Sequence, residues 1–194
     1  KAIYYYSLAA NQNDPEAQHN LGVIYSEGKY ISRNINKAIY YFEKAANQNY
    51  PEAQYNLGVI YEEGKYISRD INKAIYYYSL AANQNDPEAQ HNLGVIYSEG
   101  KYISRNINKA IYYFEKAANQ NYPEAQYNLG VIYEEGKYIS RDINKAIYYY
   151  SLAANQNYSN AQLNLGFIYS EGKYISRDIN KAIYYFEKAA NQNY

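Results

Sequence analysis

The chain has 194 residues, and its 19 Lys and Arg balance 19 Asp and Glu, so the formal net charge is zero. A neutral chain lacks the field that draws nucleic acid or an anionic membrane surface, and no apolar run approaches the roughly 18 residues of a membrane span. Without cysteine there are no disulfides and no thiolate chemistry. With 31 tyrosines but no Trp or Met, tyrosine must fill the core as well as cover the surface.

Two short sequence motifs recur every 36 residues. Lys-Ala-Ile-Tyr-Tyr starts at residues 1, 37, 73, 109, 145 and 181, and Asn-Leu-Gly-Val-Ile-Tyr starts at 20, 56, 92 and 128, and at 164 with Phe for Val. A period of this length indicates a solenoid, a propeller or an array. We expect one array, with a partial repeat and five full repeats: 1–14, 15–50, 51–86, 87–122, 123–158 and 159–194. Residues 1–72 and 73–144 are identical, so the true unit is a copied pair of repeats.

The first helix of each repeat, helix A, has clear ends. Pro51 suits the first helical position, where its missing N–H costs nothing. Asp14 and Asp86 precede the equivalent prolines and predict N-caps in alternate copies. Gly64 follows the last turn and predicts a left-handed end.

Helix A has one apolar face and one glycine inside it. The face consists of Ala53, Leu57, Ile60 and Tyr61. Gly58 costs about 1 kcal/mol relative to Ala within a helix. We therefore expect a neighbouring helix to approach closely at Gly58.

A loop and a second helix, helix B, complete the repeat. Tyr66 and Ile67 recur in the loop, and we expect both to tuck under the turn. Asp70 predicts the N-cap of helix B, and Asn85 its end, since Asn tolerates the left-handed conformation. The apolar face of helix B consists of Ile71, Ala74, Tyr78, Ala81 and Ala82. One helix pair cannot bury both faces alone, so the pairs must stack. The chain begins on helix B, which gives about eleven helices.

These residues resemble the Sel1-like repeat, a relative of the tetratricopeptide repeat. The matching positions in one copy are Lys37-Ala38, Tyr41, Lys44-Ala45-Ala46, Ala53, Asn56-Leu57-Gly58, Tyr61, Gly64, Asp70 and Lys73-Ala74. The resemblance implies an all-α, right-handed α/α superhelical solenoid with the A helices on its concave side. It also implies an adaptor that assembles proteins, and it supplies no catalytic residues.

No pattern in the sequence predicts catalysis, a metal or a cofactor. His19 and His91 are the only histidines and lie two repeats apart, too far to share a metal within one site, so we interpret both as surface histidines. The adjacent pair Glu62-Glu63 diverges by about 100° on a helix, so we interpret it as a solvated face and not as an acid–base pair. The chain contains neither a phosphate-binding loop nor a Ser-His-Asp set.

A basic stripe with an aromatic residue recurs in each loop: Lys65, Tyr66, Arg69 and Lys73 in one copy. Such a stripe suits a nucleic-acid backbone with stacked bases. The neighbouring glutamates and the zero net charge argue against that use, so we predict no nucleic-acid partner.

The internal copies differ at three positions of helix A, which we name the variable face. These positions are His19, Tyr55, His91, Tyr127 and Leu163; Val23, Val59, Val95, Val131 and Phe167; and Ser26, Glu62, Ser98, Glu134 and Ser170. At 100° per residue they lie roughly opposite the apolar face. Free variation on an exposed surface gives this pattern, and so does a concave groove that binds a protein or peptide. The groove is our first functional hypothesis.

The alternative hypothesis is a structural segment of a long self-associating array or filament. Tyr40 points away from the small-residue stripe of helix B by about 200°. In the other type of repeat the equivalent Tyr has Leu four residues later, which gives the pairs Tyr4–Leu8, Tyr76–Leu80 and Tyr148–Leu152. We expect these pairs to point outward, where a row of them would form a lateral contact.

Overall fold

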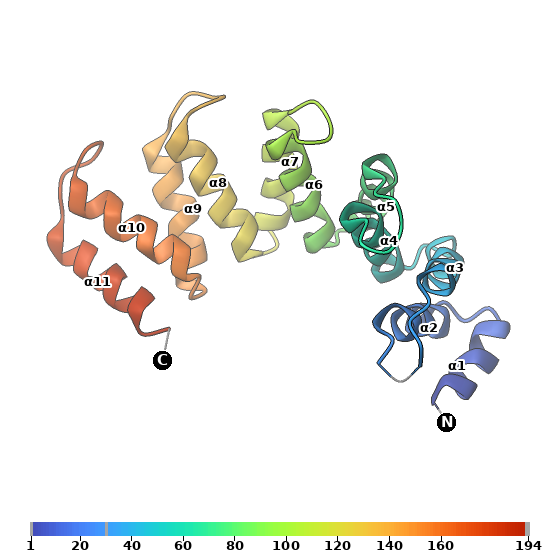
Figure 1. Cartoon of the computed structure of the whole chain (residues 1–194). Coiled ribbons are helices and arrows are strands. Elements are labelled where there is room, and N and C mark those ends of the chain that lie inside the picture. Colours follow the sequence, from blue (N-terminus) through green and yellow to red (C-terminus); the bar gives the residue numbers. More distant parts are fainter. Residues whose placement is uncertain (1, 30, 193–194) are drawn as a thin grey trace. The chain divides into compact units, whose positions relative to one another are not determined.

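The structure of the protein is a computed structural model that describes residues 2–29 and 31–192. Over these ranges the regular elements are eleven α-helices, without a strand (Figure 1). They are α1 (Ala2–Asn11), α2 (Pro15–Glu27), α3 (Ile35–Ala46), α4 (Pro51–Glu63), α5 (Ile71–Asn83), α6 (Pro87–Glu99), α7 (Ile107–Ala118), α8 (Pro123–Glu135), α9 (Ile143–Asn155), α10 (Ser159–Glu171) and α11 (Ile179–Ala190). The predicted all-α repeat fold is confirmed.

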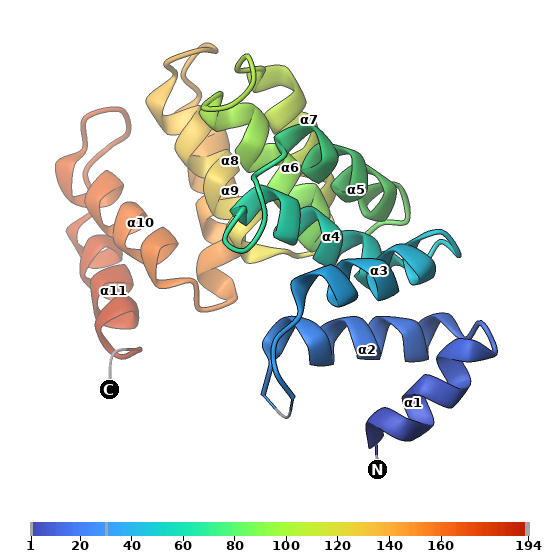
Figure 2. The same ribbon diagram turned by 45° about the vertical axis from the view of Figure 1, so that its right-hand side comes forward.

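The helices form two compact units, Lys1–Leu93 and Gly94–Tyr194. Within the first unit, α2 packs on α3 and α4 on α5; within the second, α8 packs on α9 and α10 on α11. Each of these pairs is one A–B repeat. Successive repeats join where a B helix contacts the next A helix, as α3 does with α4 and α9 with α10. Figure 2 shows α2, α3 and α4 stacked in this way.

The helix ends follow the predicted caps. The Asp14 carboxylate accepts a 2.9 Å hydrogen bond from the backbone N–H of Ala17, whereas Tyr50 provides no side-chain cap at the equivalent place. Gly64 has a φ of 61°, in the left-handed region. Asn85 has a φ of 66°, which confirms that Asn ends helix B in the same way that Gly ends helix A.

A tight contact lies inside each repeat, between the glycine of helix A and an aromatic ring of helix B. A Cβ atom on Gly58 would lie 2.5 Å from Cδ1 of Tyr78, and one on Gly22 would lie equally close to Cδ1 of Phe42. Both rings are almost completely buried. The predicted close approach is therefore confirmed, and its partner is the helix B of the same repeat.

A buried glutamine that the sequence analysis missed connects successive repeats. Gln54 is 1% exposed. Its amide nitrogen donates to the Ala46 carbonyl of the preceding repeat at 3.1 Å, and its amide oxygen accepts from Gln84 Nε2 at 2.8 Å. A buried amide without partners costs free energy, so these bonds hold both helix ends at fixed positions. The equivalents Gln18, Gln90, Gln126 and Gln162 are buried too.

The expectation for Tyr66 was wrong. Its side chain is 47% exposed, and only Ile67 is half-buried. The Tyr66 ring lies 4.6 Å under the guanidinium of Arg33 from the preceding loop, and its hydroxyl accepts a hydrogen bond from that group. Arg33 also donates to the Glu27 carbonyl at 3.1 Å. A cation over the ring face holds the tyrosine outward, and consecutive loops are thereby connected.

Replacing Gly58 with Ala tests the tight contact. We expect destabilisation of about 1–3 kcal/mol from overpacking, despite the gain of about 1 kcal/mol in helix propensity. Urea unfolding of Gly58→Ala, Tyr78→Ala and the double variant measures the coupling. Without the ring, the Gly58→Ala change should become neutral or stabilising. Stabilisation by Gly58→Ala alone would contradict the packing.

Candidate functional site

The variable face is half-buried in the first four full repeats. Its aromatic positions pack on the ring of helix B. The Tyr55 and Tyr78 ring centroids are 5.8 Å apart, and those of Tyr127 and Tyr150 are 5.7 Å apart. Only in α10 are the first two positions exposed: Leu163 by 38% and Phe167 by 53%. A large aromatic side chain on the variable face can extend across the helix surface toward helix B. Its angular distance from the apolar face therefore overestimates its exposure.

His19 is not the surface histidine that the sequence analysis expected. Its ring contacts those of Phe42 and Tyr50, and Nε2 lies 2.9 Å from Nδ2 of Asn56 in the next repeat. Burial lowers the pKa of the His19 imidazole, because the charged form loses hydration. The neutral ring therefore contributes to the joint between two repeats.

Glu62 is not simply part of a solvated face either. Its Oε2 accepts a 2.7 Å hydrogen bond from the hydroxyl of Tyr78, and Glu134 accepts one from Tyr150 at 2.6 Å. Burial, followed by the neighbouring Glu62 carboxylate, raises the pKa of Tyr78 well above its usual range. The hydroxyl of Tyr78 therefore stays protonated and remains a donor.

The third variable position changes together with the ring of helix B. Every repeat with Tyr on helix B has Glu on helix A, and every repeat with Phe has Ser. The pairs are Ser26 with Phe42, Glu62 with Tyr78, Ser98 with Phe114, Glu134 with Tyr150, and Ser170 with Phe186. Ser26 bonds instead to the Val23 carbonyl at 2.9 Å. Variation at this position is therefore compensatory and not free.

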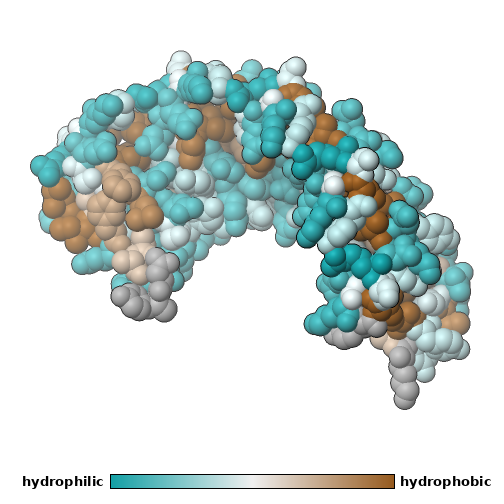
Figure 3. Space-filling model, in the orientation of Figure 1, coloured by the Kyte–Doolittle hydropathy of each residue, from teal (hydrophilic) through white to brown (hydrophobic). Residues whose placement is uncertain are grey.

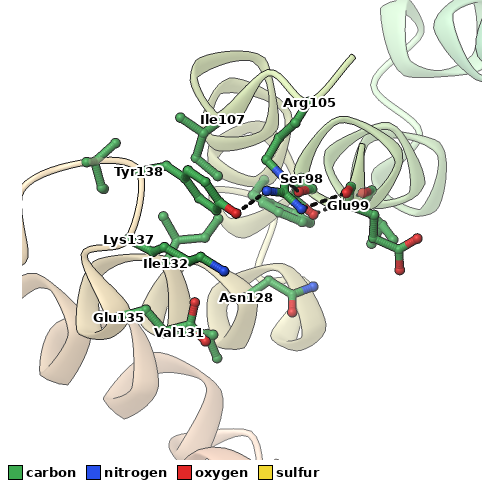
Figure 4. Close-up of a pocket in the computed structure, with 13 residues that line it drawn as sticks. Ser98, Glu99, Arg105, Ile107, Asn128, Val131, Ile132, Glu135, Lys137 and Tyr138 are labelled. Atoms are coloured by element: carbon green, nitrogen blue, oxygen red, sulfur yellow. Dashed lines mark hydrogen bonds between the residues drawn. The ribbon is translucent and has the colours of Figure 1, made fainter. Parts of the chain in front are cut away.

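Two equivalent pockets follow the repeats that carry Ser and Phe, and we name them the open pockets. One has a volume of about 270 Å³ between α2, α3 and α4, and the other has about 320 Å³ between α6, α7 and α8. Figure 4 shows the second, with Ser98 and Asn128 at the cavity and Tyr138 at its wall. The positions shared by both are Val23, Ser26, Glu27, Ile35, Phe42, Asn56, Val59, Ile60, Glu63, Lys65 and Tyr66, each repeated 72 residues later.

The corresponding space after the repeat with Glu and Tyr is nearly closed, to about 60 Å³. Asn164 Nδ2 donates to the Tyr150 hydroxyl at 2.9 Å, and that hydroxyl donates to Glu134. These three residues correspond to Asn128, Phe114 and Ser98 of the open pocket. At the closed joint Glu134 replaces Ser98 and Phe167 replaces Val131 among the lining residues, so both changes accompany the smaller volume.

Six residues of the variable face line the open pockets: Val23, Ser26 and Val59 in the first, and Val95, Ser98 and Val131 in the second. His19, Tyr55, Glu62 and Tyr127 do not line them. The lining side chains of Ser, Asn, Glu and Lys offer hydrogen bonds and charge around an aliphatic and aromatic floor. Within residues 2–29 and 31–192, no cluster of three or more His, Asp and Glu is placed to hold a metal ion.

The outward Tyr–Leu pairs are only partly present. Tyr76 and Tyr148 are 58% and 59% exposed, but Leu80 and Leu152 are half-buried. Only in α1 are both partners exposed, Tyr4 and Leu8. The fourth residue along a helix is rotated by about 40°, which turns these leucines toward the core.

The Sel1 repeat profile matches residues 1–14, 15–50, 51–86, 87–122, 123–158 and 159–194. These are the repeats predicted from the motifs that recur every 36 residues. The chain belongs to the Sel1 repeat family. Sel1 repeat proteins are commonly non-catalytic scaffolds for protein interactions. No curated protein sequence matches the chain. Among the helices that the structure describes, none combines the length and apolar character of a membrane span.

Solved Sel1 repeat structures resemble the chain closely. The protective antigen c5321 of uropathogenic Escherichia coli is 31% identical, with a TM-score of 0.93 over 98% of this chain and 41% of the antigen. The chain thus spans about two-fifths of that protein. A Sel1 repeat protein of Oxalobacter formigenes is 33% identical, with a TM-score of 0.82 over 94% of this chain and 74% of its own. Helicobacter pylori cysteine rich protein B is 31% identical over 68% of this chain, with a TM-score of 0.51.

Exchange of the residues at a closed joint tests the pairing of Tyr150 with Glu134. We expect Tyr150→Phe and Glu134→Ser each to destabilise the repeat, because each leaves a polar group without its partner. The double variant reproduces the Phe–Ser pair of the sister repeats. It should recover about 1.5–3 kcal/mol relative to additivity, the range for a hydrogen bond to a charged group. Urea unfolding measures this coupling, and additive effects would show that the two residues act independently.

Alkaline pH should weaken the fold. Burial, with Glu43 and Glu115 nearby, raises the pKa of Tyr77 and of Tyr149 to about 12. The unfolded value is about 10, so the unfolded chain loses these protons first, and the free energy of unfolding falls as pH rises from about 10 to 12. Below about pH 10 this contribution is complete. Urea unfolding should show a shallower fall in a Tyr77→Phe, Tyr149→Phe variant; parallel curves would contradict the assignment.

Proposed function

We propose that this Sel1 repeat chain is a non-catalytic scaffold that binds a protein or peptide on the variable face of its A helices. The observation that carries the proposal is the presence of an open pocket on this face in each of the two units, with the same residues around it. Specific polypeptide binding concentrates in such places, where an apolar floor excludes water and a polar rim fixes orientation.

The variable face offers the side chains that protein interfaces favour. Tyr55 and Tyr127 are half-buried and held by Tyr78 and Tyr150, so binding costs them little conformational entropy. In α10 the same face has exposed apolar residues. Brown side chains reach the surface over α10 and α11 in Figure 3. The exposed apolar residues of these two helices include Leu163, Phe167, Ile179 and Ile183.

The charge distribution favours a polypeptide over a nucleic acid as the partner. The net charge is zero. Lys65 lies 5.3 Å over the Tyr66 ring, and Lys73 lies 4.7 Å over the Tyr61 ring, so cations of the loop stripe already pair with the chain's own tyrosines. A phosphate backbone would have to compete with these contacts.

Self-association into a longer array is the second proposal. It is supported by exposed tyrosines on successive B helices: Tyr40, Tyr76, Tyr112 and Tyr148. The half-buried Leu80 and Leu152 reduce the apolar area that a lateral contact would bury. Sedimentation across concentration distinguishes this proposal from the first, because a scaffold remains monomeric until its partner is added.

Peptides selected from a random phage-displayed library test the scaffold. We expect Tyr55→Ala with Tyr127→Ala to weaken their binding by about tenfold or more, as loss of a central aromatic contact does. Calorimetry measures the affinity, and circular dichroism checks that helicity is retained. Tyr55→His with Tyr127→His is the matched control, because it carries the ring found in the sister repeats. Equal affinity in the parent and the Ala variant would place the binding surface elsewhere.

A further inference from the structure

We propose that each open pocket receives one aromatic side chain of the bound polypeptide, and that the joint with Glu134 and Tyr150 is closed to it. The inference rests on the proposed scaffold function and specifies its partner: a polypeptide whose aromatic residue anchors it in an open pocket. Two neighbouring joints of the same chain carry the argument.

The open pocket of the second unit is built for a flat apolar group. The ring of Phe114, 1% exposed, lines it, and Val131, Ile132 and Ile139 add aliphatic walls. Tyr138 closes one side and is fixed there by Arg105, whose guanidinium lies 4.5 Å over its ring and hydrogen bonds to its hydroxyl (Figure 4). Aromatic rings pack favourably against such edges and faces. A volume near 300 Å³ is at the lower end for ligand sites, which suits one side chain.

The neighbouring joint shows how the chain itself fills the equivalent space. There the Tyr150 hydroxyl and the Glu134 carboxylate occupy the region that corresponds to Phe114 and Ser98, and the cavity shrinks to about 60 Å³. The open pocket is the same joint with Phe114, Ser98 and Val131 in place of Tyr150, Glu134 and Phe167. Without the hydroxyl and the carboxylate, its floor has less hydrogen-bonding capacity, which favours an apolar occupant.

The final repeat shows that the pocket wall can hold a phenyl group at the position of Val131. Phe167 replaces the valine found at Val131, and its ring packs edge to face on Phe186 with centroids 5.2 Å apart. Phe167 also lines the residual cavity of that joint. At the open pocket the smaller Val131 leaves space for a phenyl ring, and the bound polypeptide supplies that ring.

The mixed charge at the rim fits the backbone around such an anchor. Glu27, Glu63 and Lys65 line the first pocket, and Glu99, Glu135, Arg105 and Lys137 line the second. The acidic side chains can accept from the amides that flank an aromatic residue, and the basic ones can donate to them.

Methyl NMR with a minimal probe tests the pockets. N-acetyl-L-phenylalaninamide should shift the methyl signals of Val23, Val59, Val95 and Val131 saturably, with a Kd of about a millimolar, as expected for so few atoms. N-acetyl-L-leucinamide should shift them at least about threefold less at equal concentration, since it lacks the ring. Equal shifts with the two amides would overturn the aromatic preference.

A closing variant provides the matched control. Ser26→Glu with Phe42→Tyr introduces the pair that the sister repeats carry, so the fold has a precedent within the chain. We expect the probe shifts at Val23 and Val59 to weaken by about tenfold or more, while those at Val95 and Val131 remain as an internal reference. Val59→Phe, which copies Phe167, should block the same pocket from the opposite wall. Unchanged binding in the folded variants would overturn the proposal.

The outcome also separates this inference from the scaffold function. Peptides selected on the parent should lose affinity when both pockets are closed, by Ser26→Glu, Phe42→Tyr, Ser98→Glu and Phe114→Tyr. If they bind that variant as well as the parent, yet depend on Tyr55 and Tyr127, the aromatic anchor is wrong and the scaffold stands. If N-acetyl-L-phenylalaninamide binds, but the affinity of the peptides depends neither on the pocket residues nor on Tyr55 and Tyr127, the scaffold proposal fails by itself.

Discussion

The contact between a helix-A glycine and a helix-B ring determines much of this structure. Gly58 on Tyr78, like Gly22 on Phe42, leaves no room even for a methyl group, so the two helices of a repeat meet at a fixed distance. Protein interiors are packed densely enough for such a contact to fix a side chain in one position. The far end of the ring then lies at the joint with the next repeat. The para substituent of the ring, a hydrogen in Phe or a hydroxyl in Tyr, therefore lies at the same place in every repeat.

Because the ring is fixed, its para substituent determines the chemistry of the joint. A buried phenolic hydroxyl needs partners, and Tyr150 has two: it donates to Glu134 and accepts from Asn164. A phenyl ring at that place needs none, so Ser98 is sufficient beside Phe114 at the open pocket. Hydrogen-bond satisfaction therefore couples one residue of helix B to one of helix A.

The sequence predicts those features that depend on local spacing. The helices follow from period and caps: Asp14, Gly64 and Asn85 each act as expected, and Gly58 predicted a close approach because a glycine in a helix interior needs a reason. The pockets were not predictable in this way. They are lined by residues of three helices, such as Ser98, Phe114 and Asn128, and no helical periodicity predicts that these residues meet. Gln54 was not predicted either, because a polar residue beside an apolar face is expected to be exposed unless its buried hydrogen-bond partners are known.

The compensating pairs also give a physical reason for the 72-residue unit. Phe to Tyr alone would bury a hydroxyl beside a serine, and Ser to Glu alone would place a carboxylate against a phenyl ring; each step costs stability that the paired change recovers. A repeat that has made both changes is a distinct, self-consistent version of the same fold. Copying the two versions together preserves their alternation, as the identity of residues 1–72 and 73–144 shows. The two open pockets are therefore lined by the same residues, 72 positions apart, one in each copied pair of repeats.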